Sequence, residues 1–213
     1  QQLLDADYLA QRARLIDPQR AQDFGPGNPP KGGTVYLTAA DASGMMVSYI
    51  QSNFMGFGSG VVVHGTGISL QNRGSTFVLQ PGHPNCVGPS KRPFQTIIPG
   101  FVTRAGQPVM SFGVMGGTMQ PQGHAQVMVR IADYGQNPQA ACDGPRFRFV
   151  QGLDVSVEDG FPKASLEALQ RRGHRIVTVN DYNQFGSAQL IWKLDGGYFA
   201  GSDPRRDGQA VGF

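Results

Sequence analysis

Residues 32–41 read GGTVYLTAAD and mark where the main folded part of the chain is expected to begin. A Gly-Gly pair runs directly into Thr34, the first residue of an apolar segment with strand character. A threonine hydroxyl is unreactive without a base, but cleavage of the chain just before it would free an α-amine that can take the proton. Gly33 suits such a cleavage because it has no Cβ to hinder attack on its carbonyl. On these residues alone the simpler interpretation is favoured, in which Thr34 only opens a β-hairpin after a linker.

The chain before this stretch differs from the chain after it, and we expect the main domain to begin at Thr34. Residues 1–17 are predicted to form a helix because their apolar side chains recur at helical spacing, namely Leu3, Leu4, Tyr8, Leu9, Leu15 and Ile16. Residues 22–33 read QDFGPGNPPKGG. A segment so rich in proline and glycine cannot pack a core and is predicted to be a mobile linker.

Most of the chain after Thr34 consists of short apolar runs separated by glycine turns, with helical patterns between them. Helices are predicted at residues 121–134, from residue 138 onward, and at 162–172. Strands are predicted at 34–40, 45–52, 61–64, 67–70, 96–103, 108–114, 147–150, 153–157, 174–179, 188–194 and 197–200. This order predicts an α+β protein built from antiparallel hairpins rather than from alternating βαβ units, with helices on the outer faces of a sheet sandwich.

The bulk composition excludes several classes of function. The chain has 213 residues and a formal net charge of +3 from dispersed basic residues, which does not indicate a nucleic-acid partner. No run reaches the roughly 18 apolar residues of a membrane helix. The four histidines lack metal-ligand spacing, so no metal site is expected. Cys86 and Cys142 are expected to be unpaired thiols rather than a disulfide framework.

Two further glycine-rich stretches are candidates for chemistry. Residues 56–60, GFGSG, lack the Lys-Ser/Thr of a phosphate-binding loop and precede a strand instead of a helix, so we reject a nucleotide site. Gly116 and Gly117 lie between a predicted strand and the best predicted helix. Their backbone N–H groups could stabilise an oxyanion, although a tight turn explains them equally well in isolation.

Six blocks occur along the chain in a fixed order: TVYLTAAD, GFGSGVVVHGTGISLQN, KRPFQTIIP, VMGGTMQPQGHAQ, DYG…DGPRF and GSDPRRDGQAVGF. Together they resemble the small, catalytic subunit of the γ-glutamyltransferases (γ-glutamyltranspeptidases, glutathione hydrolases), which are N-terminal nucleophile hydrolases. The resemblance covers residues 34–213. Residues 1–33 resemble the tail of the family's large subunit and the precursor linker. The resemblance implies the four-layer αββα sandwich, in which antiparallel sheets are flanked by helices.

The resemblance also implies a self-cleaving precursor. The hydroxyl of Thr34 would attack the carbonyl of Gly33, water would open the resulting ester, and the new terminal threonine would attack the γ-glutamyl amide of glutathione. Water or an amino acid would then resolve the acyl-enzyme, without metal or cofactor. The implied partner is the large subunit from the same precursor, which carries an arginine for the substrate carboxylate and is not in this chain. While the bond before Thr34 is intact, its nitrogen is an amide and cannot act as a base, so the isolated chain is expected to be inactive.

Individual roles carry over by position. The glycine pair matches the oxyanion hole, and one hydroxyl matches a second threonine that assists the nucleophile. One asparagine matches the substrate pocket, and two neighbouring positions match serines that hold the α-carboxylate, of which one keeps a hydroxyl. The glycine pair is Gly116 and Gly117, the assisting hydroxyl is that of Ser52, and the pocket asparagine is Asn72. The two carboxylate-binding positions are Gln95 and Thr96, of which Thr96 keeps the hydroxyl.

Several positions depart from the family pattern. Thr76 stands where an acidic residue pairs with the glutamyl α-ammonium, and Arg73 replaces a neighbouring glutamine with a charge that repels an ammonium. A pocket asparagine falls on Phe54, or on Asn53 after a one-residue slip. Loss of a carboxylate–ammonium contact weakens γ-glutamyl specificity. The loop at 80–91 is short, which predicts an open site without a lid.

Three interpretations follow. The first is the catalytic half of a γ-glutamyltransferase, uncleaved and without its partner. The second is an amidase of the same fold with another acyl group, such as a glutaryl or cephalosporin acylase, which needs no acidic partner for an α-amine. The third is a non-catalytic relic. The compartment, cytoplasmic or exported, stays open.

Overall fold

The computed structural model describes residues 5–15 and 33–213, and the chain divides into two units, residues 1–32 and 33–213. In the first unit, α1 (Ala6–Ala13) begins after Asp5, whose side chain accepts a hydrogen bond from the Tyr8 nitrogen at 2.8 Å. This helix lies within the one predicted for residues 1–17. The predicted linker lies outside the described residues except for Gly33. Among the helices described, none has the length and apolar character needed to cross a membrane.

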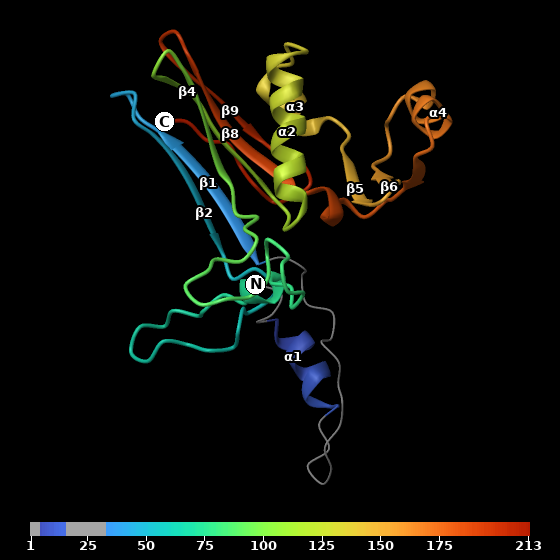
Figure 1. The fold of residues 1–213 in the computed structure, drawn as a ribbon. Helices are drawn as coiled ribbons and strands as arrows, with labels where there is room; N and C mark the ends of the chain where they lie inside the picture. The colour runs from blue at the N-terminus through green and yellow to red at the C-terminus, as the bar shows by residue number, and fades with distance from the viewer. Residues whose placement is uncertain (1–4, 16–32) are drawn as a thin grey trace. The chain divides into compact units, whose positions relative to one another are not determined.

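The second unit is built on two antiparallel sheets (Figure 1). A hairpin is formed by β1 (Thr34–Ala40) and β2 (Met46–Ser52). The larger sheet has the strand order β3-β4-β8-β9, with the strands β3 (Pro99–Arg104), β4 (Gln107–Met115), β8 (Ser187–Leu194) and β9 (Gly197–Ser202). The predicted hairpins at both ends of the chain are confirmed.

The β1–β2 hairpin is fixed to the larger sheet by a tyrosine and two hydroxyl contacts. Tyr36 is buried against β4 at Gly113, where an added Cβ would come within 2.4 Å of its ring. The Thr38 and Ser111 hydroxyls hydrogen-bond to each other between the two sheets. Ser48 of β2 donates to the Gly100 carbonyl at 2.8 Å. The strand that begins with Thr34 is therefore held firmly against β4.

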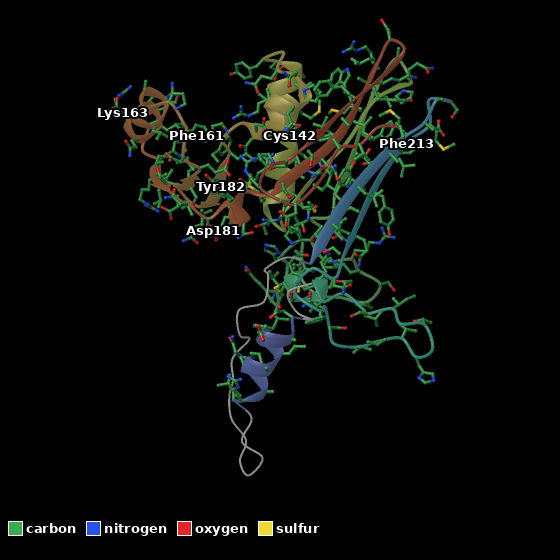
Figure 2. The ribbon with its side chains drawn as sticks, turned by 180° about the vertical axis from the view of Figure 1, so that it is seen from behind. Cys142, Phe161, Lys163, Asp181, Tyr182 and Phe213 are labelled. Carbon is green, nitrogen blue, oxygen red and sulfur yellow. The ribbon has the colours of Figure 1, made fainter. Side chains whose placement is uncertain are left out.

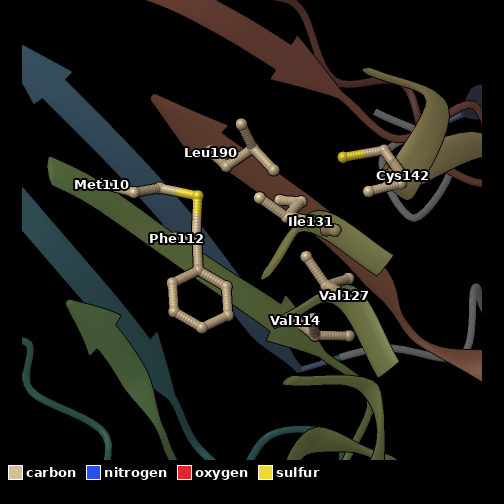
Figure 3. Close-up of a cluster of buried hydrophobic side chains, with 9 residues drawn as sticks. Met110, Phe112, Val114, Val127, Ile131, Cys142 and Leu190 are labelled. Atoms are coloured by element: carbon tan, nitrogen blue, oxygen red, sulfur yellow. The ribbon is translucent and has the colours of Figure 1, made fainter. Parts of the chain in front are cut away.

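Helices cover the other face of the larger sheet and enclose the core between α2 (Met119–Ala132), α3 (Pro138–Asp143) and strands β4 and β8 (Figure 3). Asn137 caps α3 as predicted, accepting from the Ala140 nitrogen at 2.8 Å. The core residues are Met110, Phe112, Val114, Val127, Ile131, Ala141, Cys142, Ala188 and Leu190. Residues 33–213 thus supply the layers α, β and β of the predicted αββα sandwich, and no helix of this unit covers the hairpin.

A smaller lobe holds β5 (Phe147–Gln151), β6 (Asp154–Val157), α4 (Lys163–Arg171) and β7 (Arg175–Thr178). Phe161 and Lys163 mark it in Figure 2, on the side of the large sheet away from the hairpin. Here β6 and β7 pair in parallel. This parallel pair differs from the predicted antiparallel hairpins, because α4 returns the chain between the two strands and makes one βαβ unit.

Other differences are local. The strands predicted at 61–64 and 67–70 are absent, and only an isolated bridge joins Val62 to Ser69. Glycines 60, 65 and 67 all have positive φ and keep this segment irregular. The strand predicted from residue 96 begins at Pro99, and the helix predicted from residue 121 begins at Met119. Two short 3-10 helices, Arg73–Thr76 and Tyr182–Phe185, were not predicted.

Candidate active site

Two hydroxyls meet where the hairpin opens. Thr34 is the first residue of β1 and Ser52 the last of β2, and the antiparallel register pairs them directly. Their oxygens lie 2.8 Å apart, within hydrogen-bond distance. The register of one hairpin therefore brings the predicted nucleophile and its predicted assistant together.

The carbonyl before Thr34 is also held. Its oxygen, on Gly33, accepts a hydrogen bond from the Asn53 backbone nitrogen at 3.2 Å. An added Cβ at Gly33 would lie 3.2 Å from the Gly56 carbonyl oxygen and 3.4 Å from that of Phe54, so a larger residue is crowded here. An N–H aimed at this oxygen is suited to stabilise negative charge when the carbonyl is attacked.

Arg73 lies under the hydroxyl pair and is 1% exposed. Its Nη1 donates to the Thr96 hydroxyl at 2.8 Å and its Nη2 to Ser52 Oγ at 3.3 Å. The Phe54 ring lies 4.5 Å from the guanidinium carbon, and Phe54 has a φ of 73°, a strained value for a bulky residue.

The charge of Arg73 has no carboxylate partner among the ion pairs of the described residues. Burial lowers the pKa of Arg73, but a guanidinium stays charged in proteins. The sequence contains no aspartate or glutamate between Asp41 and Asp133. The segment that supplies nearly all the predicted site residues therefore offers only positive charge.

Gly116 and Gly117 form the turn between β4 and α2, with φ angles of 133° and 58°. An added Cβ at Gly117 would meet nothing within 4 Å, so this side of the turn is open. Gly116 packs so closely on Gly186 that an added Cβ would lie 2.8 Å from the Gly186 Cα. In Figure 1 this turn lies at the end of the sandwich where β1 begins. Their role as an oxyanion hole stays a prediction.

A cavity of about 490 Å³ reaches Thr34 from the side of the C-terminal tail. It is lined by β1, by β8 and β9, by Met115 and by residues 206–211. Phe213 lies beside β1 at the end of this tail (Figure 2). Asp207 is the acidic residue among the lining residues.

The remaining predicted substrate residues are engaged with the protein or exposed. The Asn72 amide accepts from the Met55 nitrogen at 3.0 Å and donates to the Met55 and Gly58 carbonyls. The Thr76 hydroxyl donates to backbone carbonyls at 2.8 and 3.1 Å. Gln95 is exposed. Both bonded side chains hold their own loops, and their contacts with substrate stay predictions.

Sequence reasoning missed a buried ionic network behind the glycine turn. Arg146 donates to Asp203 at 2.7 Å and to the Gly186 carbonyl at 3.0 Å. Arg205 pairs with Glu158 at 2.5 Å and with Asp203 at 3.0 Å. The quoted blocks DGPRF and GSDPRRDG contain three of these residues. Because Gly186 packs on Gly116, the network supports the turn that carries the predicted oxyanion hole.

Other reactive groups of the described residues are not arranged for chemistry. Within residues 5–15 and 33–213, no group of three or more His, Cys, Asp or Glu side chains is placed to hold a metal ion. Cys86 and Cys142 are both free. Burial raises the pKa of the Cys142 thiol to about 12, so this cysteine is a core residue rather than a nucleophile.

Comparison with known proteins gives a consistent family. The profile described as gamma-glutamyltranspeptidase matches residues 1–213. The glutathione hydrolase-like YwrD proenzyme of Bacillus subtilis is 38% identical over 226 residues, which cover 100% of this chain and 42% of that protein. The oxamate amidohydrolase proenzyme of Klebsiella pneumoniae is 37% identical, with coverage of 100% and 42%. The chain thus spans less than half the length of these relatives.

A solved structure agrees. The cephalosporin acylase from Bacillus halodurans is 53% identical with a TM-score of 0.77, and the match covers 98% of this chain and 38% of that one. The α+β fold predicted from the sequence is therefore that of a solved acylase chain.

Proposed function

The chain belongs to the gamma-glutamyltranspeptidase family, and on this premise we propose that it is the catalytic half of an amidohydrolase that cuts its own precursor before Thr34. The observation that carries the proposal is the Thr34–Ser52 hydroxyl pair, 2.8 Å apart, next to a Gly33 carbonyl that already accepts an N–H. Residues 34–213 would be the small subunit. Residues 1–33 would be the tail of the large subunit and the linker.

The first reaction of this proposal is self-cleavage. Thr34 Oγ1 forms a bond to the Gly33 carbonyl carbon while the Asn53 N–H stabilises the oxyanion. The carbon–nitrogen bond then breaks, the hydroxyl proton ends on the departing amine, and an ester joins Gly33 to the threonine oxygen. Water hydrolyses this ester. The product has a free α-amine on Thr34, which is the base the uncut chain lacks.

The second reaction is amide cleavage of a substrate. The freed α-amine takes the hydroxyl proton as Thr34 Oγ1 attacks the amide carbonyl, and the N–H groups of Gly116 and Gly117 receive the oxyanion. The leaving amine takes the proton, and water or an acceptor amine resolves the acyl-enzyme. We propose γ-glutamyl amides such as glutathione as the substrates, with Asn53, Asn72 and Gln95 in the pocket and with Thr96 supporting it through the hydroxyl that holds Arg73. The remaining carboxylate contact would come from the large subunit.

A second candidate function is an acylase for acyl groups without an α-amine. Two features favour it: Thr76 is uncharged with its hydroxyl engaged, and residues 42–132 contain no carboxylate. An ammonium bound near Thr34 would be repelled by the buried charge of Arg73, and no carboxylate in this segment would offset that repulsion. The amide and acylase names of two relatives, an oxamate amidohydrolase and a cephalosporin acylase, agree with this alternative.

The full-length precursor separates these candidates. γ-Glutamyl-p-nitroanilide and glutaryl-p-nitroanilide share a leaving group and differ only in the α-amine. We expect both signals to vanish in Thr34→Ala, and the ratio of kcat/KM for the two substrates identifies the acyl group. A strong γ-glutamyl preference removes the acylase candidate, and a strong glutaryl preference removes the first. A precursor that stays uncut and hydrolyses neither substrate contradicts the catalytic proposal and supports a relic.

A further inference from the structure

The direction of the hydrogen bond between the two hydroxyls follows from the other partners of Ser52. A hydroxyl oxygen has two lone pairs and one proton. Ser52 Oγ accepts from the Phe54 backbone nitrogen at 2.8 Å and from Arg73 Nη2 at 3.3 Å. Both lone pairs are used, so the Ser52 proton points to Thr34 Oγ1, 2.8 Å away. The Thr34 proton is then left free to depart.

Three contacts fix Arg73, two of them at the guanidinium and one at its backbone. Nη1 is anchored on Thr96, itself 1% exposed, and the Phe54 ring covers the guanidinium face. The backbone nitrogen of Arg73 is bound by the Gln71 side chain. An arginine with its fork fixed in this way presents Nη2 to Ser52 in one direction only.

A buried cation with no carboxylate is costly. A neutral side chain could hold the 3-10 helix at lower cost, so we ask where negative charge would make the cation useful. The ion pairs of the described residues offer no anion to it, but negative charge develops on Thr34 Oγ1 as its proton is removed, before the bond to the carbonyl carbon is complete. The Ser52 hydroxyl lies between that oxygen and the guanidinium and is hydrogen-bonded to both.

We propose that Arg73 is a positioning residue that acts on Thr34 through Ser52. It fixes the Ser52 hydroxyl as a donor to Thr34 Oγ1 and thereby stabilises the negative charge that this oxygen gains in self-cleavage and in acylation. The inference rests on the proposed function of Thr34. It also separates Arg73 from the substrate: a side chain that is 1% exposed acts on the nucleophile without touching the acyl group.

Self-cleavage provides the test, because it needs no substrate. The full-length precursor is followed by mass spectrometry as wild type, Arg73→Met, Arg73→Lys, Ser52→Ala and the double variant Ser52→Ala/Arg73→Met, with thermal unfolding midpoints for each. We expect Arg73→Met to slow cleavage at least about tenfold, as loss of a preorganised donor does. Lysine, which keeps the charge, is expected to restore part of the rate.

The double variant reports whether Arg73 works through Ser52. We expect it to cleave no more slowly than Ser52→Ala alone, because without the hydroxyl the guanidinium has nothing to orient. In the cleaved forms, Arg73→Met should lower kcat for a p-nitroanilide with little change in KM.

Several results would overturn the inference. Cleavage of Arg73→Met within about twofold of the wild-type rate is one, and additive losses in the double variant are another. If Ser52→Ala cuts too slowly to measure, the lysine variant decides, and no recovery over methionine refutes the charge effect. A wild-type precursor that stays uncut contradicts the proposed function itself. If the wild-type precursor cleaves itself and Arg73→Met cleaves at the same rate, only the role of Arg73 is contradicted.

Discussion

At the scale of single residues, Gly186 decides whether the Gly116 turn can form. It has a φ of 70°, and an added Cβ would lie 2.3 Å from the Met115 carbonyl oxygen. We expect Gly186→Ala to destabilise the precursor by about 1–3 kcal/mol and to slow acylation, measured as unfolding free energy and kcat. Gly196→Ala is the matched control, because Gly196 has a φ of 83° with nothing within 4 Å. Equal losses in both variants would show that backbone strain alone, and not the contact with β4, is responsible.

A second residue, His124, links the core to pH. Its Nδ1 lies 2.7 Å from the Gln120 carbonyl and must donate to it, while Nε2 accepts from the Val114 nitrogen at 3.4 Å. Burial lowers the pKa of His124 from its usual 6.5. As the pH falls below about 6.5, His124 binds a proton in the unfolded chain more readily than in the folded chain. The free energy of unfolding that is present above about pH 6.5 therefore decreases as the pH falls. In chemical denaturation, His124→Gln is expected to flatten the slope of unfolding free energy between about pH 6.5 and 5. An unchanged slope would assign the pH dependence to other groups.

At the level of single residues, the sequence indicated which residues are candidates for the site, but it did not indicate which side chains would surround them in the fold. Thr34 and the glycine pair were named as candidates from their places in the quoted blocks, and Ser52 from its position between two of these blocks. That Arg73 would be buried beneath them was not predictable, because charged residues are usually exposed and nothing local indicates which long-range hydroxyls it meets. The two short runs at 34–40 and 45–52, separated by a glycine turn, did predict the hairpin, and its register then placed the two hydroxyls opposite each other.

At the scale of elements, the ionic network joins the start of β5, the end of β6 and the end of β9. Removing one partner of a buried pair leaves the other charge uncompensated. Asp203→Asn is expected to cost about 3–5 kcal/mol, read as a large fall in the unfolding midpoint. Asp154→Asn is the control, because the Asp154–Arg175 pair is exposed and should contribute little. Similar midpoints for Asp203→Asn and wild type would refute a structural role for the network.

The prediction of elements succeeded where neighbouring residues determine the structure, as at a helix cap. It failed where the pairing of strands determines it. Asn137 before Pro138 predicted α3, whereas α2 ends at Ala132, two residues before the end that Gly135 predicted. The strands β6 and β7 pair in parallel. This pairing joins segments that are separated in sequence by α4, so a pattern within either strand does not predict it. The apolar residues at 61–70 resembled strands, but the positive-φ glycines between them limit their pairing to one bridge.

At the scale of the whole molecule, the outer face of the β1–β2 hairpin is apolar and open. Leu37 and Tyr49 face each other across the strands and are 47% and 50% exposed. No helix of residues 33–213 covers this face. We propose that the large subunit of the proposed precursor does, since the curated relatives are more than twice as long as this chain.

Tyr49→Lys tests this surface. We expect it to weaken association of the two halves after cleavage, seen as dissociation on size-exclusion chromatography at low concentration. Leu79→Lys is the matched control, because Leu79 is 83% exposed and lies in a loop outside β1 and β2. Comparable elution of wild type and Tyr49→Lys would place the large subunit elsewhere.

The central claim is that Thr34 becomes a free N-terminal nucleophile. The most direct measurement is the N-terminal sequence and intact mass of the products from the full-length precursor. We expect a chain that begins at Thr34 in the wild type and a single uncut chain in Thr34→Ala. A wild type that stays whole, a product that begins at another residue, or a Thr34→Ala precursor that still divides would contradict it.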